Sequence, residues 1–143
     1  MYLRPSSYIP LVVLCMLMEF WAMTNFNINV SDSSTPRGLY RVRTVQLADL
    51  RRGDLVALRM PVKQIAALPG QHVMFTREGI YVEGKLIPNT APEVDLVHFP
   101  FGSYTVPPYM FVGIGTLNPD SWDSRYAGFI PQSITEGTVT RVW

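Results

Sequence analysis

The chain has 143 residues and a formal net charge of +1, from 12 basic and 11 acidic side chains. This length suffices for one modest domain with its own core. The near balance of charge gives no basic excess for nucleic acid, so no nucleic-acid partner is expected. The single cysteine, Cys15, cannot form an internal disulfide, and residues 27–143 contain no thiol for catalysis or metal binding.

The two histidines, His72 and His98, have no second histidine or acidic residue at a convincing ligand spacing. No other motif indicates a metal ion or an organic cofactor. We therefore expect a protein that works without either.

The N-terminal segment is strongly apolar. Residues 8–23 read YIPLVVLCMLMEFWAM, with Arg4 upstream and no Lys or Arg inside the run. A charged start followed by an apolar stretch is typical of an export signal or an uncleaved anchor. The run is shorter than the ~20 residues that a full span requires. Glu19 interrupts it, at a cost of roughly 2.5–3.5 kcal/mol if held at the bilayer centre.

No clear Ala-x-Ala processing site follows this run. We therefore predict a retained transmembrane anchor over residues 1–26, with Arg4 on the cytoplasmic side. This orientation would place a domain of residues 27–143 in the periplasm, tethered to inner-membrane lipid by a single pass. A buried core helix and a cleaved leader are the alternatives.

The remainder alternates short β-type runs with turns. Residues 27–36 are polar and are expected to link the anchor to the first strand. No later stretch sustains helical periodicity over three turns, so the fold class is predicted to be mainly β, with coiled antiparallel sheets. The expected strands are Leu39–Val45, Leu55–Met60, His72–Thr76, Ile80–Gly84, Leu96–Phe99, Tyr104–Val106, Met110–Gly115 and Thr138–Trp143.

Two segments carry residue types used in hydrolysis. A hydroxyl cluster at residues 31–35 precedes Pro36-x-Gly38 and, read alone, is typical of a plain turn. Lys63 begins an apolar run, where an inward-pointing lysine would lose hydration and its pKa would fall. Its neutral amine could then act as a general base toward a serine hydroxyl. A solvated strand lysine is the plain alternative.

A third segment, residues 113–126, contains Asn-Pro-Asp followed by Ser121, Asp123 and Arg125. Read alone, it is typical of a turn with a surface ion pair, which contributes little to stability.

Together these segments resemble the type I signal peptidases, and among them the conjugative-transfer (TraF-type) peptidases. The resemblance covers almost the whole chain after Asn27, and its pieces follow the family order. They are Asn-x-Ser-Asp-Ser (29–33) with Pro-x-Gly-Leu-Tyr-Arg (36–41), Arg-Gly-Asp-Leu-Val (52–56), Lys63 before Leu-Pro-Gly (68–70), Tyr-Val-Glu-Gly-Lys (81–85), Val-Pro-Pro (106–108) and Asp-Ser-Arg-Tyr-x-Gly (123–128).

The resemblance implies a serine nucleophile at Ser33, with Ser34 as the alternative. Ser33 lies two residues after Ser31 and keeps the Ser-x-x-Pro spacing of general signal peptidases, whereas the conjugative relatives show Ser-x-Pro, which fits Ser34. Lys63 maps to the general base. Ser31 maps to a support for the oxyanion hole.

The last motif implies supporting roles. Ser121 maps to a hydroxyl that orients the lysine, and Asp123 and Arg125 map to an ion pair behind the site. Two family features are absent: Thr116 replaces an aspartate, and Tyr109 replaces a glycine that commonly follows Pro-Pro.

The resemblance further implies a membrane-anchored endopeptidase acting on precursor proteins with leader peptides, such as a conjugative pilin. Small residues before the scissile bond would suit it, and some relatives join a pilin's ends instead of trimming them. Two rivals are a catalytically silent tethered β domain that assembles a secretion or conjugation machine, and an organellar processing peptidase. Pro-Arg-Gly-Leu-Tyr (36–40) disfavours the latter.

Overall fold

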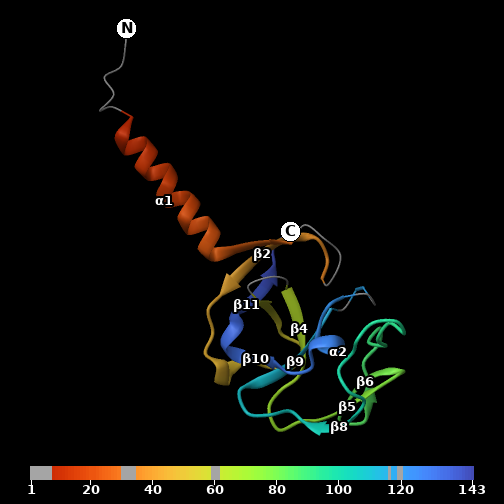
Figure 1. Cartoon of the computed structure of the whole chain (residues 1–143). Coiled ribbons are helices and arrows are strands. Elements are labelled where there is room, and N and C mark those ends of the chain that lie inside the picture. Colours follow the sequence, from red (N-terminus) through yellow and green to blue (C-terminus); the bar gives the residue numbers. More distant parts are fainter. Residues whose placement is uncertain (1–7, 30–34, 59–61, 116, 119–120) are drawn as a thin grey trace.

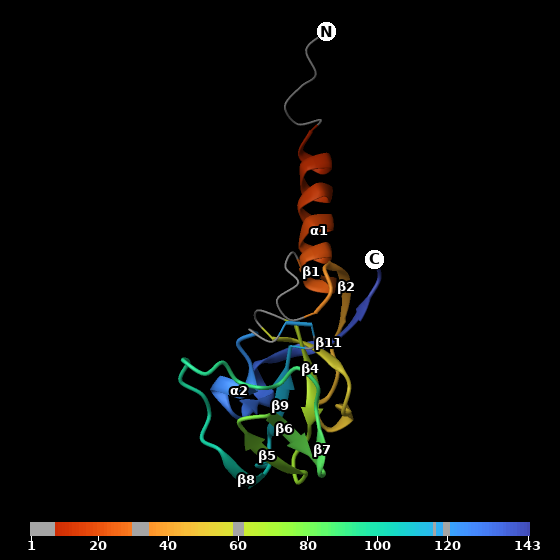
Figure 2. The same ribbon diagram turned by 90° about the vertical axis from the view of Figure 1, so that its right-hand side faces the viewer.

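The computed structural model describes residues 8–29, 35–58, 62–115, 117–118 and 121–143. It shows a helix standing on a mainly β domain, and the helix points away from that domain in both views (Figures 1 and 2). The expected mainly β class with antiparallel sheets is confirmed.

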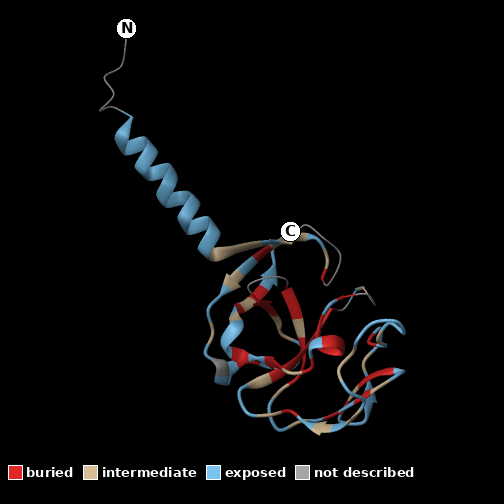
Figure 3. Cartoon of the chain, in the orientation of Figure 1, coloured by how far each residue is buried: buried red, intermediate tan, exposed pale blue. Residues whose placement is uncertain are grey.

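Helix α1 (Ile9–Asn25) is made of the apolar N-terminal run, and none of its residues is buried (Figure 3). Pro10 lies in the first turn, where a missing N–H costs no hydrogen bond. Polar side chains bond to carbonyls of the last turn: Thr24 Oγ1 donates to the Phe20 carbonyl at 3.0 Å, and Asn25 Nδ2 donates to the Trp21 carbonyl at 2.8 Å.

At 17 residues, α1 is about 25 Å long. Within the described ranges, no helix combines the length and apolar character needed to cross a membrane. The membrane-spanning segment expected at residues 1–26 is therefore not supported.

The described strands form two antiparallel sheets. The larger sheet has the spatial order β1 (Phe26–Asn29), β2 (Gly38–Arg43), β11 (Thr135–Arg141), β3 (Leu55–Leu58), β4 (Val62–Ala67), β9 (Met110–Ile114) and β10 (Ile130–Pro131). The smaller sheet has the order β7 (Lys85–Leu86), β6 (Gly79–Val82), β5 (His72–Thr76) and β8 (Gly102–Thr105). Short turns complete the domain: 3₁₀ turns η2 (Leu47–Asp49) and η3 (Gln132–Ile134), and the one-turn helix α2 (Ser124–Ala127).

Strand β4 connects the hydrophobic clusters. It pairs with β3 on one side and β9 on the other, and its register against β9 shifts between Ile65 and Ala67. Ile65 packs into the cluster of Leu50, Val56 and Phe111, whereas Ala66 and Ala67 pack into the cluster shared with the smaller sheet. Such an irregularity re-aims side chains along one strand, so β4 serves both cores.

Two expectations, the strand at Leu96–Phe99 and the linker at residues 27–36, need correction. The strand His72–Thr76 is confirmed, but no strand forms at Leu96–Phe99. Phe99 is instead held by aromatic contacts, with its ring centroid 4.8 Å from that of Phe75 and 5.5 Å from that of Phe129. The supposed linker begins with strand: residues 27–29 belong to β1, which pairs with β2. Of the run Leu55–Met60, Leu55–Leu58 is strand, and the rest lies outside the described residues.

A candidate active site around Lys63

Lys63 lies near the start of β4, opposite Val56 of β3, and its side chain is 2% exposed. Burial strips water from the ammonium group and lowers the pKa of Lys63 from 10.5 to about 8. The carboxylate of Asp123 opposes this change, and the guanidinium of Arg125 adds to it. The expectation of an inward-pointing lysine with a lowered pKa is met by this geometry.

The Lys63 amine has a hydroxyl partner far away in the sequence. Its Nζ donates to the Oγ of Ser121 at 2.7 Å, and Ser121 is also buried. A hydrogen bond from one N–H to a fixed acceptor restricts the rotation of the amine. The directions of the other N–H bonds, or of the lone pair, are thereby restricted too. Ser121 thus orients Lys63.

Behind Ser121, Asp123 and Arg125 form a fully buried ion pair. The Arg125 Nε and Nη2 donate to the two Asp123 carboxylate oxygens, each at 2.9 Å, and the backbone N–H of Gly115 donates to Oδ2 at 2.7 Å. Bidentate geometry and an added backbone donor are what a buried pair needs to offset its lost hydration. The plain reading of a surface ion pair is wrong.

Arg125 also fastens the loop that carries Ser121. Its Nη2 donates to the carbonyls of Ser121 at 2.9 Å and Asn118 at 3.2 Å, and its Nη1 donates to the carbonyl of Asn89 at 3.3 Å. One guanidinium therefore joins the loop after β9 to the chain that follows β7. Because Ser121 is held by its carbonyl, Arg125 indirectly positions the hydroxyl that bonds Lys63.

Sequence reasoning assigned no role to Ser124 or Gly113. The Ser124 Oγ accepts the backbone N–H of Gly113 at 2.9 Å, which ties α2 to β9. A Cβ on Gly113 would lie 2.9 Å from the Phe111 ring and 3.5 Å from the Lys63 Cβ, so the missing side chain lets these groups pack. Ser124 lies within the Asp-Ser-Arg motif, but its hydrogen-bond partner, Gly113, can be identified only from the folded structure.

The proposed serines, Ser31, Ser33 and Ser34, lie outside the described residues. The described residues that flank them are bonded to each other: the Asn29 side-chain amide donates to the Thr35 carbonyl at 2.8 Å and to the Pro36 carbonyl at 3.1 Å. The Tyr40 hydroxyl also donates to the Pro36 carbonyl, at 2.6 Å. Both flanks of the serine segment are thus fixed to the start of β2.

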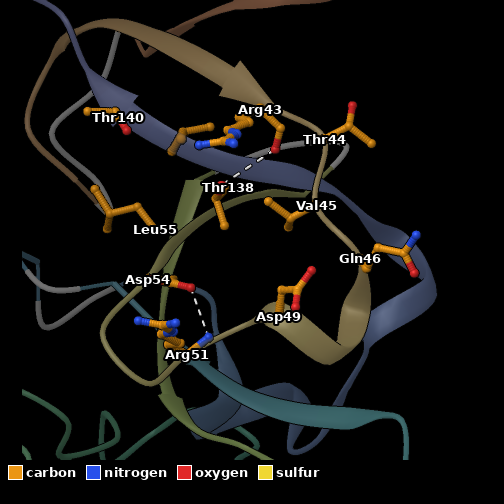
Figure 4. Close-up of a pocket in the computed structure, with 11 residues that line it drawn as sticks. Arg43, Thr44, Val45, Gln46, Asp49, Arg51, Asp54, Leu55, Thr138 and Thr140 are labelled. Carbon is orange, nitrogen blue, oxygen red and sulfur yellow. Dashed lines mark hydrogen bonds between the residues drawn. The ribbon is translucent and has the colours of Figure 1, made fainter.

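Two cavities among the described residues are not lined by Lys63. One, of about 670 Å³, is lined mainly by apolar groups, including Leu50, Leu68 and Tyr109. The other, of about 620 Å³, we call the mixed-charge pocket; Figure 4 shows Arg43, Asp49, Arg51 and Asp54 around it, with threonines of β11. The candidate site is therefore defined by its buried polar contacts.

Comparison with known proteins identifies the family of the chain. The family model described as "Signal peptidase, peptidase S26" matches residues 4–143. A protein of Synechocystis sp., "Probable signal peptidase I-2", is 30% identical over 114 residues, covering 68% of this chain and 50% of that protein. The chain thus spans about half the length of this relative. A signal peptidase I crystal structure from Enterococcus faecalis V583 aligns at a TM-score of 0.46 and 23% identity, covering 68% of this chain and 100% of that one. On the family match over nearly its whole length, the chain belongs to the peptidase S26 family of signal peptidases.

Proposed function

We propose that this chain is a serine endopeptidase in which Lys63 is the general base and Ser33 the nucleophile, with Ser34 as the alternative. The observation that carries the proposal is the buried Lys63 amine, whose pKa is lowered to about 8 and whose direction is set by Ser121. At pH 7 about one such amine in ten is neutral, against about one in three thousand for an ordinary lysine.

In the proposed reaction, the neutral Lys63 amine takes the proton of the serine hydroxyl as the serine oxygen attacks the scissile carbonyl. The ammonium then gives that proton to the leaving amine as the peptide bond breaks, which leaves an acyl-enzyme. Water attacks the ester, Lys63 takes a proton from the water, and the proton returns to the serine as the acid product leaves. Ser31, beside the nucleophile's backbone N–H, is proposed to stabilise the oxyanion.

The Asp123–Arg125 pair supports this chemistry without taking part in proton transfer. The Asp123 carboxylate favours the charged form of Lys63, which stabilises the ammonium that forms after proton transfer. Arg125 limits this effect and holds the Ser121 loop. The base is thus neutral often enough to act, while its protonated form keeps a partner.

The proposed substrates are exported precursor proteins with leader peptides, cut after small side chains. The family supports this substrate class, and the motif order supports the conjugative subtype with a pilin as substrate, in the periplasm. We further propose that residues 1–26 attach the domain of residues 27–143 to the inner membrane, because every residue of α1 is left unburied. The alternative function is a membrane-tethered β domain without catalytic activity, and the following test distinguishes the two.

The test is cleavage of a pilin-like precursor by the detergent-solubilised chain. Lys63→Ala and Ser33→Ala should lose activity, while Lys85→Ala, which removes the exposed lysine of β7, should cut like the wild type. Loss in Ser34→Ala alone would move the nucleophile to Ser34. Normal cutting by Lys63→Ala would refute the serine–lysine mechanism, and an inactive wild type would favour the tether.

A further inference from the structure

The junction between α1 and the domain stacks three kinds of side chain in order. The Trp21 and Phe26 rings meet edge to face, with centroids 5.8 Å apart. On Phe26 lies the guanidinium of Arg41, whose central carbon is 5.8 Å from the ring centroid. An apolar helix is thus followed by an aromatic layer and then by a cation that the ring holds in place.

Strand pairing extends this surface. Arg41 and Arg43 lie two residues apart in β2, so they share one face of the sheet, and both are exposed. Phe26 is opposite Arg41, and Ile28, which is 71% exposed, is opposite Leu39 on the same face. We call the set of Trp21, Phe26, Ile28, Arg41 and Arg43 the foot of α1.

The arginines of the foot are not neutralised by their surroundings. Within the described ranges, neither guanidinium has a carboxylate within 4.0 Å. Asp49 and Asp54 line the mixed-charge pocket with Arg43, and Figure 4 shows them across the pocket from it. Glu136 lines another hollow, which also includes Phe26 of the foot but neither Arg41 nor Arg43.

The order of apolar helix, aromatic rings and arginines matches the order of hydrocarbon, interface and headgroup phosphate in a bilayer. We propose that the foot of α1 docks on a bilayer that carries anionic phospholipid, with Arg41 and Arg43 binding headgroup phosphates. The inference rests on the proposed membrane attachment through α1, and it adds a lipid preference located in β2. Charge complementarity favours an anionic partner, and the adjoining apolar helix, none of whose residues is buried, selects a bilayer over an acidic protein.

The experiment measures where the full chain settles between two vesicle populations. Sedimenting, sucrose-loaded vesicles of equal parts phosphatidylcholine and phosphatidylglycerol compete with unloaded vesicles of phosphatidylcholine alone, and the compositions are then exchanged. The variant is Arg41→Gln with Arg43→Gln. The matched control is Arg52→Gln with Arg77→Gln, which removes the same charge from exposed turns elsewhere.

The wild type should prefer the anionic vesicles, and the Arg41/Arg43 variant should lose about 30-fold of that preference, as expected for about 1 kcal/mol per arginine. The control should keep the preference, and raised salt should weaken it. If the variant and the control lose the same amount of preference for anionic vesicles, net charge alone explains the effect and the proposal is overturned. A wild type without this preference would also overturn it. Partition needs no substrate, so Lys63→Ala should behave as the wild type, and failure here is separable from failure of the proposed catalysis.

Discussion

The Arg125 cluster, by which we mean the buried pair of Asp123 and Arg125, and the mixed-charge pocket use the same residue types to different effect. In the first, Asp123 and Arg125 are fully buried and joined by two bonds of 2.9 Å. In the second, two arginines and two aspartates surround an open space of about 620 Å³ (Figure 4), and the bond drawn between Arg51 and Asp54 uses the backbone N–H, at 2.8 Å. Charge in the pocket remains hydrated, whereas charge in the cluster depends on its protein partners. It is the buried pair of the Arg125 cluster that acts on the pKa of the neighbouring Lys63.

The largest effect should come from removing one partner of the buried pair. Arg125→Gln leaves the Asp123 carboxylate buried without its guanidinium, which should reduce the free energy of unfolding by about 3–5 kcal/mol. Arg51→Gln in the mixed-charge pocket should change it by less than about 0.5 kcal/mol. Urea unfolding of both variants checks the difference, and similar losses would show that the contrast in burial has no energetic meaning.

Lys63 should lower the stability of its own protein. Its pKa is about 8 when folded and 10.5 when unfolded, so between these pH values the unfolded chain binds more protons and stability rises with pH. Below pH 8 the buried ammonium charge lowers the free energy of unfolding by about 3 kcal/mol. Replacing Lys63 also removes its hydrogen bond to Ser121, which contributes about 1 kcal/mol.

Lys63→Met should therefore raise the free energy of unfolding at pH 7 by about 2 kcal/mol. The gain should vanish above pH 10.5, where the lysine is neutral in both states. Unfolding curves at both pH values give the measurement. A gain that persists at high pH would mean that packing, and not charge, is responsible.

Activity should follow the neutral fraction of Lys63. For a pKa of about 8, kcat/KM should rise about tenfold between pH 7 and pH 9 and then level off. Asp123→Asn removes the carboxylate that raises this pKa, so the midpoint should move to lower pH. Asp54→Asn, in the mixed-charge pocket, should leave the midpoint unchanged. If the midpoint is the same in Asp123→Asn as in the wild type, the ion pair does not influence the pKa of Lys63.

The smallest expected effect compares two hydroxyls. Ser124→Ala leaves the buried N–H of Gly113 without its acceptor and should cost about 1–2 kcal/mol in the free energy of unfolding. Thr138→Ala removes an exposed bond of 3.4 Å to the Arg43 carbonyl and should cost under about 0.5 kcal/mol. Thermal unfolding measures both, and a reversed order would contradict the assignment of Ser124 as a buried link.

The sequence allowed candidate side chains to be chosen, but it did not allow their burial to be predicted. Short motifs in a fixed order singled out Lys63, Ser121, Asp123 and Arg125, and the structure brings these four side chains together. Burial of the ion pair could not be predicted, because its cover comes from distant segments: Arg125 bonds the Asn89 carbonyl, and its own carbonyl accepts the N–H of Phe99.

Strand prediction failed at two segments where the local pattern of apolar and polar residues did not correspond to strand pairing. Residues 96–99 look like a strand, yet Phe99 is fixed by ring packing and not by a backbone ladder. β1 was missed because Ile28 is its only aliphatic residue; pairing with β2 makes it a strand. In both cases, the deciding partner lies elsewhere in the chain.

The position of β11 has a consequence for when the candidate site is assembled. This strand, Thr135–Arg141, lies between β2 and β3, so those two strands cannot join one sheet until it inserts. The Lys63–Ser121 bond likewise spans 58 residues. Contacts this distant in sequence form late in folding because loop closure is costly. We therefore expect the proposed peptidase activity to appear only after β11 has inserted.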